Sequence, residues 1–352
     1  MNTQQLLRLR IKIDRQLGKF FDGKIKQAAP LPSFVGRAIG EIKNFALRDG
    51  KRFRPILFYF GYIAAGGKSR EAALRSSIFI ELIHDAILIH DDIIDRDTLR
   101  RGKPTMHERF KTLYRGKTAD AGQVGVSFGI MAGDMLLGYG YEALVSSKFS
   151  PVAKEGALKK LGSVLSYAAT GEELDILYSA RPKAGLRDIL RVYEYKTARY
   201  TIEGPLHLGA ILAGADEEFL KKLSRFAIPL GIVFQIQDDI LGMFGDEKTT
   251  GKSASSDLKQ GKQTILIFEA RRRANKKQRR IIDRVLGNRN LTNHQTEEIR
   301  KIIRETKSLE YAEKLARKLV DRSKAAIKKS FLPRAAEDFL MRLADYVVSR
   351  KA

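Results

Sequence analysis

The sequence predicts an all-α protein that forms a single domain. Apolar residues recur at three- and four-residue intervals through most of its 352 residues, and no convincing strand with a two-residue period appears. Only nine residues are proline and 43% are hydrophobic, a composition typical of a helix-rich globular chain. None of the segments rich in Gly, Pro and Ser is long enough to link separate domains, so we expect one domain over residues 1–352.

Two long segments are predicted as core helices from this periodicity. They are "LRSSIFIELIHDAILIHDDIID" (Leu74 to Asp95) and "FLKKLSRFAIPLGIVFQIQDDILGMF" (Phe219 to Phe244). Pro229 lies inside the second pattern, so we expect a kink or a helix start near it and a reduced helical tendency at Ile228. Loops are expected where Gly, Pro and Ser gather, at Ala28 to Ser33, Ala64 to Ser69, Leu99 to Thr105, Ala180 to Gly185 and Gly245 to Ser256.

Composition excludes some classes of site and favours certain partners. Because the chain has no cysteine, it has no disulfide, thiolate metal site or cysteine nucleophile, and any metal must bind oxygen or imidazole. The net charge of +24 favours a polyanionic partner, such as a phosphorylated small molecule, an anionic membrane or nucleic acid. The basic residues from Arg271 onward alternate with apolar ones, which indicates a solvated helix face. The N-terminal residues lack the apolar run of a secretion signal or membrane span, so we expect a cytoplasmic protein.

The stretch "IHDDIIDRDTLRRGKPT" (Ile89 to Thr105) concentrates negative charge at the end of a predicted helix. Asp91 and Asp95 are four residues apart and share one helix face, with Asp92 beside them. Their like charges repel, and they lie near a helix C-terminus, where the macrodipole is also negative. The cluster therefore requires a cation. Two sources are open from the residues alone, a bound metal ion or the neighbouring side chains of Arg96, Arg100 and Arg101.

The same construction occurs a second time, which favours a metal. An apolar helix again ends in paired aspartates, at Asp238 and Asp239. Oxygen ligands suit hard cations, and Mg²⁺ takes one or two carboxylates while leaving its other positions to water and substrate phosphate. Two facing clusters would hold a diphosphate through bridging Mg²⁺ ions, and nearby lysines and arginines would neutralise the remaining charge.

Two other classes of function fit the sequence less well. The segment "GDEKTTGKS" (Gly245 to Ser253) approaches a P-loop, but that motif requires glycine where Asp246 stands and a strand where an apolar helix precedes it. A basic protein that binds membranes or nucleic acid would explain the net charge alone. It would leave both aspartate clusters unexplained, because carboxylates repel phosphate unless a metal intervenes.

Eight ordered motifs between Gly50 and Thr264 make the chain resemble the trans-isoprenyl diphosphate synthases of the polyprenyl synthetase family. The motifs are "GKRFRP" (Gly50 to Pro55), "ELIHDAILIHDDIID" (Glu81 to Asp95), "DTLRRGKPT" (Asp97 to Thr105), "GDMLL" (Gly133 to Leu137), "GEELDI" (Gly171 to Ile176), "YKTARY" (Tyr195 to Tyr200), "FQIQDDIL" (Phe234 to Leu241) and "GDEKTTGKSASSDLKQGKQT" (Gly245 to Thr264). A single DDxxD is weak evidence, whereas eight motifs in the family's order are specific.

The resemblance implies a fold and a reaction. The fold is an all-α isoprenoid synthase bundle of roughly a dozen helices around a central cavity, usually assembled as a homodimer. The reaction condenses isopentenyl diphosphate with an allylic diphosphate, with the catalytic motifs in residues 50–264 and a basic helical part in residues 265–352. Three Mg²⁺ ions, with Mn²⁺ as a substitute, would assist ionisation of the allylic diphosphate. Peripheral contact with an anionic membrane fits this role, and no nucleic acid is expected.

The resemblance also assigns roles to individual residues. The metal ligands would be Asp91, Asp95 and Asp238, and with Asp92, Asp239 and Lys196 they form the implied catalytic set. The allylic diphosphate would contact Arg100, Lys196, Thr197, Gln235, Lys252 and Lys262. Isopentenyl diphosphate would be bound without metal by Gly50, Lys51, Arg54, His84 and Arg101. The other histidines, His90, His107, His207 and His294, are interpreted as structural.

Two positions depart from the family's usual pattern. The second cluster ends in Gly242 where aspartate is usual, so we expect less redundancy among the metal ligands and not a loss of activity. Glu172 stands where glutamine is usual, which argues against a hydrogen-bond donor role for that side chain.

Product length in this family is set by bulky side chains below the first cluster. Ala86 and Ile87 stand five and four residues before Asp91, and the small Ala86 removes the aromatic floor typical of farnesyl diphosphate synthases. We therefore expect geranylgeranyl diphosphate (C20) or a longer product, with a farnesyl diphosphate synthase as the alternative. The "GKRFRP" motif argues against a head-to-head prenyl synthase or a terpene cyclase, and the intact first cluster argues against an inactive regulatory subunit.

Overall fold

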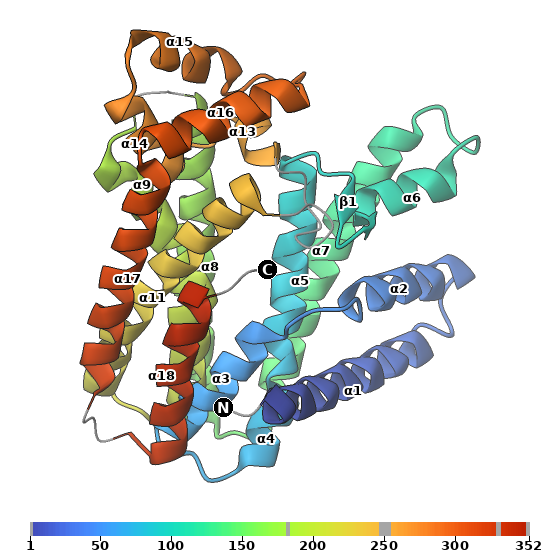
Figure 1. Ribbon diagram of the computed structural model, residues 1–352. Coiled ribbons are helices and arrows are strands. Elements are labelled where there is room, and N and C mark those ends of the chain that lie inside the picture. The colour runs from blue at the N-terminus through green and yellow to red at the C-terminus, as the bar shows by residue number, and fades with distance from the viewer. Residues whose placement is uncertain (1–2, 181–183, 246–254, 329–331, 350–352) are drawn as a thin grey trace.

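The computed structural model describes residues 3–180, 184–245, 255–328 and 332–349, and these residues are helical almost throughout (Figure 1). The helices are α1 (Thr3–Gln27), α2 (Ser33–Ala46), α3 (Phe53–Ala64), α4 (Arg70–Ser76), α5 (Ile78–Ile94), α6 (Met106–Tyr114), α7 (Ala121–Val145), α8 (Pro151–Ala180), α9 (Leu186–Val192), the π-helix η1 (Tyr193–Glu203), α10 (Gly204–Leu212), α11 (Glu217–Phe244), α13 (Ser256–Gln260), α14 (Ile265–Arg273), α15 (Lys276–Val285), α16 (Asn293–Glu305), α17 (Ser308–Ile327) and α18 (Arg334–Ser349). Within the described ranges the sheet content is one pair of two-residue strands, β1 (Leu99–Arg100) and β2 (Lys103–Pro104). The predicted all-α class is confirmed.

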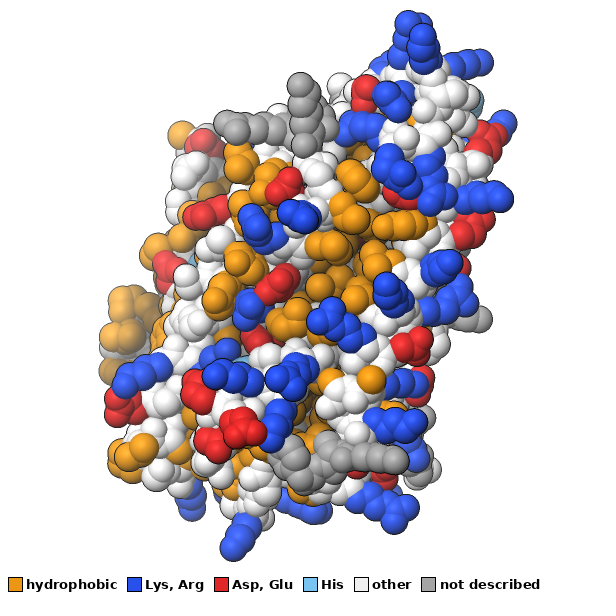
Figure 2. All heavy atoms as spheres, turned by 90° about the vertical axis from the view of Figure 1, so that its left-hand side faces the viewer, with side chains coloured by type: hydrophobic (Ala, Val, Ile, Leu, Met, Phe, Trp, Pro, Cys, Tyr) orange, Lys and Arg blue, Asp and Glu red, His pale blue; other side chains and the backbone are white. Residues whose placement is uncertain are grey.

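Several long helices, such as α7, α8 and α17, run along the height of the molecule (Figure 1), whereas the comparably long α1 projects from one side. In Figure 1, α13 to α16 lie at one end, while α1, α2 and α6 project from the side that carries α5 and α7. The basic helices near the C-terminus turn their basic side chains to solvent, as the sequence predicted. In α15, Ile282 and Val285 are buried whereas Lys276, Lys277 and Arg280 are exposed. Figure 2 shows basic side chains mixed with acidic and hydrophobic ones over one whole face.

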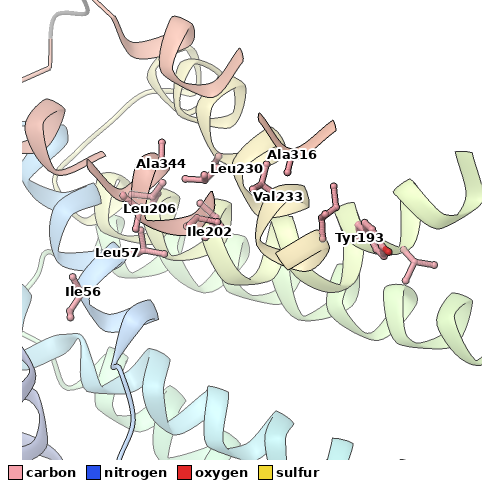
Figure 3. Packing of buried hydrophobic residues seen from close by; sticks show 14 of the residues in the cluster. Ile56, Leu57, Tyr193, Ile202, Leu206, Leu230, Val233, Ala316 and Ala344 are labelled. Carbon is pink, nitrogen blue, oxygen red and sulfur yellow. The ribbon is translucent and has the colours of Figure 1, made fainter. Parts of the chain in front are cut away.

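One connected cluster of buried hydrophobic side chains extends from Leu9 in α1 to Val347 in α18. Figure 3 shows part of it, where side chains of α3, η1, α10, α11, α17 and α18 come together. The rings of Phe60 and Phe339 stack at 3.6 Å between centroids and join α3 to α18. Each fully buried large side chain contributes about 1.5–3 kcal/mol relative to an exposed one. Helices from both ends of the chain therefore pack into the same hydrophobic core.

Glycines let α7 lie directly against α5, the helix that ends in the first aspartate cluster. A methyl group at Gly133 would overlap the ring of His90, and one at Gly140 would overlap Ile83. Any larger residue at these positions would push the two helices apart, because packed interiors have little free space. The close approach fixes the position of α5, and with it the position of the aspartates.

The segment Leu74 to Asp95 forms two helices, so the prediction of a single helix there was wrong. The break falls at Ser77, between α4 and α5. The hydroxyl of Ser77 donates a hydrogen bond to the carbonyl of Leu74 at 2.7 Å. Such a bond competes with the helical backbone pattern and redirects the chain. The second segment, Phe219 to Phe244, lies within α11 as predicted.

Pro229 does not start or interrupt α11, and Ile228 is helical, contrary to expectation. Proline inside a helix removes one backbone hydrogen bond and costs about 3 kcal/mol. Phe226, Ala227 and Leu230 are fully buried around it. Their packing offsets the cost and holds the helix together.

The expected loops agree with the structure where residues are described. Turns occur over residues 28–31 and 65–69, and the segment 99–105 forms the β1–β2 hairpin. Most of the loops expected at 180–185 and 245–256 lies outside the described residues.

Helix α11 is, by length and composition, apolar enough to cross a membrane, but more than half of its most apolar window is buried in the protein. It also carries Asp238 and Asp239 near its C-terminal end. These features identify it as a core helix.

A buried polar cluster lies where η1, α10 and α11 meet. Ser224 Oγ donates to Glu203 at 2.6 Å and lies 3.1 Å from His207 Nε2. Because the Ser224 proton is given to Glu203, Nε2 is the donor of the second bond, and Nδ1 of His207 is buried without a partner in the described part of the chain. Burial, together with the charge of Lys160, lowers the pKa of His207 to about 4. The structural role assigned to His207 agrees with this arrangement.

We predict that His207 makes the protein sensitive to acid. Between pH 6.5 and 4 the unfolded chain binds a proton that the folded His207 does not, so stability falls as pH decreases. On lowering the pH from 7 to 5, the wild type should lose about 2 kcal/mol more than His207→Gln in urea denaturation. His294→Gln, at an exposed site, should keep the wild-type dependence; identical pH profiles for wild type and His207→Gln would contradict the assignment.

Candidate active site

The first aspartate cluster lies at the C-terminal end of α5. Asp92 is fully buried, and Asp95 is the residue that caps the helix. Nε of Arg100 donates to Asp92 at 2.6 Å, and Nη2 of Arg100 lies 3.4 Å from Asp91. Burial raises the pKa of Asp92 to about 6 despite this arginine. Of the three arginines considered as a cation source, Arg100 is the one that forms an ion pair with the cluster in the described structure.

The β1–β2 hairpin separates Arg100 from Arg101. The strands pair with Leu99 opposite Pro104, and the two turn residues, Arg101 and Gly102, have φ of 53° and 70°. Two positive φ values in a two-residue hairpin turn match the twist of the strands. The guanidinium of Arg101 packs on Gly50, where an added Cβ would be 2.8 Å from Nη1. The two adjacent arginines therefore point to different parts of the site: Arg100 contacts the first aspartate cluster, and Arg101 packs against Gly50.

The second aspartate cluster is held by a hydrogen-bonded chain. Asp239 is buried, accepts a hydrogen bond from the Tyr193 hydroxyl, and accepts another from Gln235 at 2.8 Å. Thr197 donates to Gln235, and the Tyr193 oxygen accepts from the backbone N–H of Ile265 at 2.8 Å. Burial, together with the charge of Asp257, raises the pKa of Asp239 to about 7. Asp238 is half-buried beside it.

Two buried lysines lie close to the aspartate clusters. Nζ of Lys262 is 3.6 Å from Asp95 and 3.9 Å from Asp257, so it connects the end of α5 to α13. Burial alone would lower the pKa of Lys196, but the carboxylates of Asp175, Asp91 and Glu172 raise it well above its usual value. Its ammonium lies 2.6 Å from Glu172 and 2.7 Å from Asp175. Glu172, which stands where the family usually has glutamine, thus accepts a hydrogen bond from the ammonium group of Lys196.

Asp257 places a carboxylate where Gly242 lacks one. A Cβ built on Gly242 would lie 3.0 Å from Asp257 Oδ2. The oxygen thus lies next to the position from which the family's usual third aspartate would extend. No sequence spacing indicated this, because Asp257 belongs to a different helix.

A second basic region lies beside α5 and the N-terminus of α3. Arg54 donates to Thr201 at 2.7 Å, lies 2.9 Å from His84 Nε2, and stacks over the ring of Tyr200 at 4.7 Å. Nδ1 of His84 is 3.0 Å from the Tyr200 hydroxyl. Burial, with the charge of Arg54, lowers the pKa of His84 well below its usual value. His84 is therefore neutral at pH 7.

Neighbouring arginines differ in how their charge is balanced. Arg52 is buried and bonded to Glu81 at 2.7 Å and to Asp14 at 2.6 Å. Arg54 and Arg101, in contrast, have no carboxylate within 4.0 Å among the described residues. Guanidinium groups without carboxylate partners form a region suited to an anion.

Arg48, near Arg101, also has no carboxylate within 4.0 Å among the described residues. It was missed by sequence reasoning. Its guanidinium lies over the ring of Phe45 at 4.8 Å and donates to the carbonyl of Pro104 at 2.8 Å. Its Nη1 is buried and has no hydrogen-bond partner in the described structure. No motif marks this residue; Tyr200, by contrast, lies in the quoted "YKTARY".

The remaining expected residues are placed as follows. Ala86 is fully buried and Ile87 is half-buried on α5, and Lys51 is exposed beside Gly50. Lys252 lies outside the described residues. Tyr193, Thr201, Asp175 and Asp257 contribute to the site although the sequence did not assign them roles.

The oxygen donors fit Mg²⁺ in an open site. Within the described residues no three carboxylate or imidazole groups surround one point. Asp92 Oδ2 is buried without a partner, and Asp91 and Asp95 lie beside it. Mg²⁺ commonly takes one or two carboxylates and completes its shell with water and phosphate. The donors present here therefore suit a metal that binds together with a phosphorylated ligand.

Comparisons with known proteins agree with this geometry. A family profile described as polyprenyl synthetase matches residues 38–305. The chain is 32% identical to the geranylgeranyl diphosphate synthase of Saccharolobus solfataricus, over 86% of this chain and 87% of that one, and 33% identical to the geranylfarnesyl diphosphate synthase of Aeropyrum pernix, over 89% and 94%. The crystal structure of geranylgeranyl pyrophosphate synthase from Corynebacterium glutamicum, complexed with isoprenyl diphosphate and magnesium, superposes with a TM-score of 0.92 at 31% identity and covers 97% of this chain and 99% of that one.

We predict that the Tyr193 hydroxyl stabilises the second cluster. Tyr193→Phe leaves the buried N–H of Ile265 without its acceptor and removes a donor to Asp239, so the free energy of unfolding should fall by about 1–3 kcal/mol. Tyr195→Phe is the matched control, since the Tyr195 ring packs on Tyr167 but its hydroxyl has no hydrogen bond within the described ranges. Equal effects of the two substitutions in chemical denaturation would contradict the prediction.

Proposed function

The chain belongs to the polyprenyl synthetase family, and we propose that it condenses isopentenyl diphosphate with an allylic diphosphate to give a trans-polyprenyl diphosphate of C20 or longer. The observation that carries this proposal is the pair of aspartate clusters, with Lys262 between Asp95 and Asp257 and with Lys196 paired to Glu172 and Asp175. Such an arrangement of alternating charge suits a diphosphate and its metal ions. The named relatives that make C20 and longer products support the product class.

The allylic diphosphate would bind at the two aspartate clusters. Asp91, Asp95 and Asp238 would hold Mg²⁺, which when bound neutralises charge on the leaving diphosphate. Lys196 and Lys262 would bind phosphate oxygens directly, since the carboxylates around them keep both ammonium groups charged. Arg100 lies beside the same cluster and adds a bidentate donor. Preorganised positive charge of this kind lowers the barrier to C–O cleavage.

The basic region at Arg54 and Arg101 would bind isopentenyl diphosphate without metal. Neither guanidinium has a carboxylate partner in the described structure, so both can donate to phosphate. His84 is neutral and fixed by Tyr200, which orients Arg54. Arg48 offers a buried donor in the same region through its Nη1. The double bond of this substrate would attack the allylic cation, and the departing pyrophosphate would take the proton.

We extend the proposal to the organisation of the protein. The continuous core supports one catalytic domain over the whole chain. Four hydrophobic residues of α7 and α8 are exposed, namely Ile130, Met131, Val145 and Ile176, and a homodimer that buries them between its copies would remove this apolar surface from water. A cytoplasmic location accords with a buried α11.

The direct test is to incubate purified protein with Mg²⁺, isopentenyl diphosphate and allylic primers of several lengths, then size the products by mass spectrometry. The proposal expects chains of C20 or longer. Products that stop at C15 would instead identify a farnesyl diphosphate synthase. Absence of any product, combined with salt-dependent retention on nucleic acid, would favour a non-enzymatic basic binding protein.

Ala86→Phe should shorten the product. Ala86 is fully buried on α5, one and a half turns before Asp91, so a phenyl ring there would occupy space needed by a growing chain. The same assay measures product length, and Ala86→Ser serves as a small-residue control. Overpacking costs about 1–3 kcal/mol, so thermal melting is recorded for both. Wild-type product length in a folded Ala86→Phe protein would show that this helix does not limit elongation.

Asp257 should replace the aspartate missing at position 242. Asp257→Asn is expected to weaken Mg²⁺-dependent binding of pyrophosphate about tenfold in calorimetry, in the range for residues that support metal ligands. Gly242→Asp alone places a second carboxylate beside Asp257 and creates repulsion. The double variant Gly242→Asp/Asp257→Asn should recover most of the affinity. If Asp257→Asn binds as tightly as wild type, Asp257 has no part in the second cluster.

A further inference from the structure

We propose that the outer face of α1 docks the protein on an anionic lipid bilayer. The face is a stripe of five exposed basic residues, Arg8, Lys12, Arg15, Lys19 and Lys26, here called the α1 basic stripe. The inference depends on α1 alone and goes beyond the proposed reaction.

The spacing of the five residues places them in one line. At about 100° per residue they fall within roughly 60° of the helix circumference, and at 1.5 Å per residue they extend over about 27 Å. The opposite face carries Ile13, Leu17 and Phe21, which are fully buried and hold α1 on the protein. The stripe is therefore turned outward by the packing of the helix.

The charges of the stripe are not neutralised by the protein. None of its five residues makes an ion pair in the described structure, whereas other basic residues of the same helix do: Arg10 pairs with Asp49 and Lys24 with Glu142. One acidic residue, Asp22, falls on the same face, and Lys43 of α2 neutralises it. On the face drawn in Figure 2, basic side chains are interspersed with acidic ones. The α1 basic stripe thus presents five uncompensated charges.

Two exposed apolar side chains distinguish a membrane from nucleic acid as the partner. Leu7 and Ile11, each 51% exposed, lie next to each other along one edge of the stripe. Aliphatic side chains beside lysines and arginines can enter the boundary between headgroups and acyl chains. Single-stranded nucleic acid is bound through aromatic stacking, and the exposed face of α1 has no aromatic residue. Basic residues near an anionic bilayer are attracted within about one Debye length.

The test is sedimentation of the full-length protein with vesicles of phosphatidylcholine alone or mixed equally with phosphatidylglycerol. The wild type should bind the anionic vesicles and not the neutral ones. The variant Arg8→Gln/Lys12→Gln/Arg15→Gln/Lys19→Gln should lose at least about tenfold in partition coefficient. The matched control removes four charges from α15, as Lys276→Gln/Lys277→Gln/Arg280→Gln/Arg284→Gln, and should keep most of the binding. Leu7→Ser/Ile11→Ser should weaken binding at high salt, where charge attraction is screened.

Several results would overturn the proposal. Equal losses from the α1 and α15 variants would assign binding to net charge, and unchanged binding of the α1 variant would exclude the stripe. A wild type that binds RNA but not anionic vesicles would replace the membrane with nucleic acid. A change of oligomeric state in the α1 variant would assign the stripe to contact between copies. Circular dichroism confirms folding of each variant, and synthase activity on soluble substrates is measured separately, so a failed reaction and failed docking remain distinct.

Discussion

Carboxylates that lie close together repel unless positive charge separates them, and the arrangement of this site depends on that constraint. In the described structure the charge comes from the protein: Arg100 binds Asp91 and Asp92, and Lys262 lies between Asp95 and Asp257. Burial adds to the cost of the negative charge, because it disfavours the ionised carboxylate. It raises the pKa of Asp92 to about 6 and that of Asp239 to about 7. Under the proposed function, a diphosphate with its metal ions would balance the same charges.

The fold keeps these charges in place through close helix packing. Glycines on α7 allow it to lie against α5, and Gly171 on α8 allows that helix to approach the backbone at Lys196. Lys196 and Thr197 lie in the π-helix η1, whose wider turn is common at functional sites. The hydrogen bonds from Tyr193 join η1 to Asp239 of α11 and to the start of α14. Elements distant in sequence are thereby fixed relative to one another within hydrogen-bond distance.

The basic residues of the protein divide into three groups with different partners. Some, such as Arg52, are neutralised by buried carboxylates and stabilise the fold. Others, such as Arg54 and Arg101, have no carboxylate partner among the described residues and suit a phosphorylated substrate. The α1 basic stripe lies outside the site and is turned to solvent. Because paired residues such as Arg52 cancel against carboxylates, the net positive charge comes from basic residues without such partners.

The sequence by itself determined the helical class and the shared face of Asp91 and Asp95, with Asp92 beside them, because helix periodicity acts over only a few residues. It also indicated the second cluster and the roles implied by ordered motifs. Tertiary structure decided that Arg100, and not Arg96 or Arg101, pairs with the first cluster, because the hairpin turn directs adjacent side chains to different places. It also decided that α11 continues through Pro229 and that Asp257 approaches Gly242, since both depend on packing between segments far apart in the chain. Local pattern fixes which residues share a helix face, whereas the partner across the gap is set by long-range burial and charge.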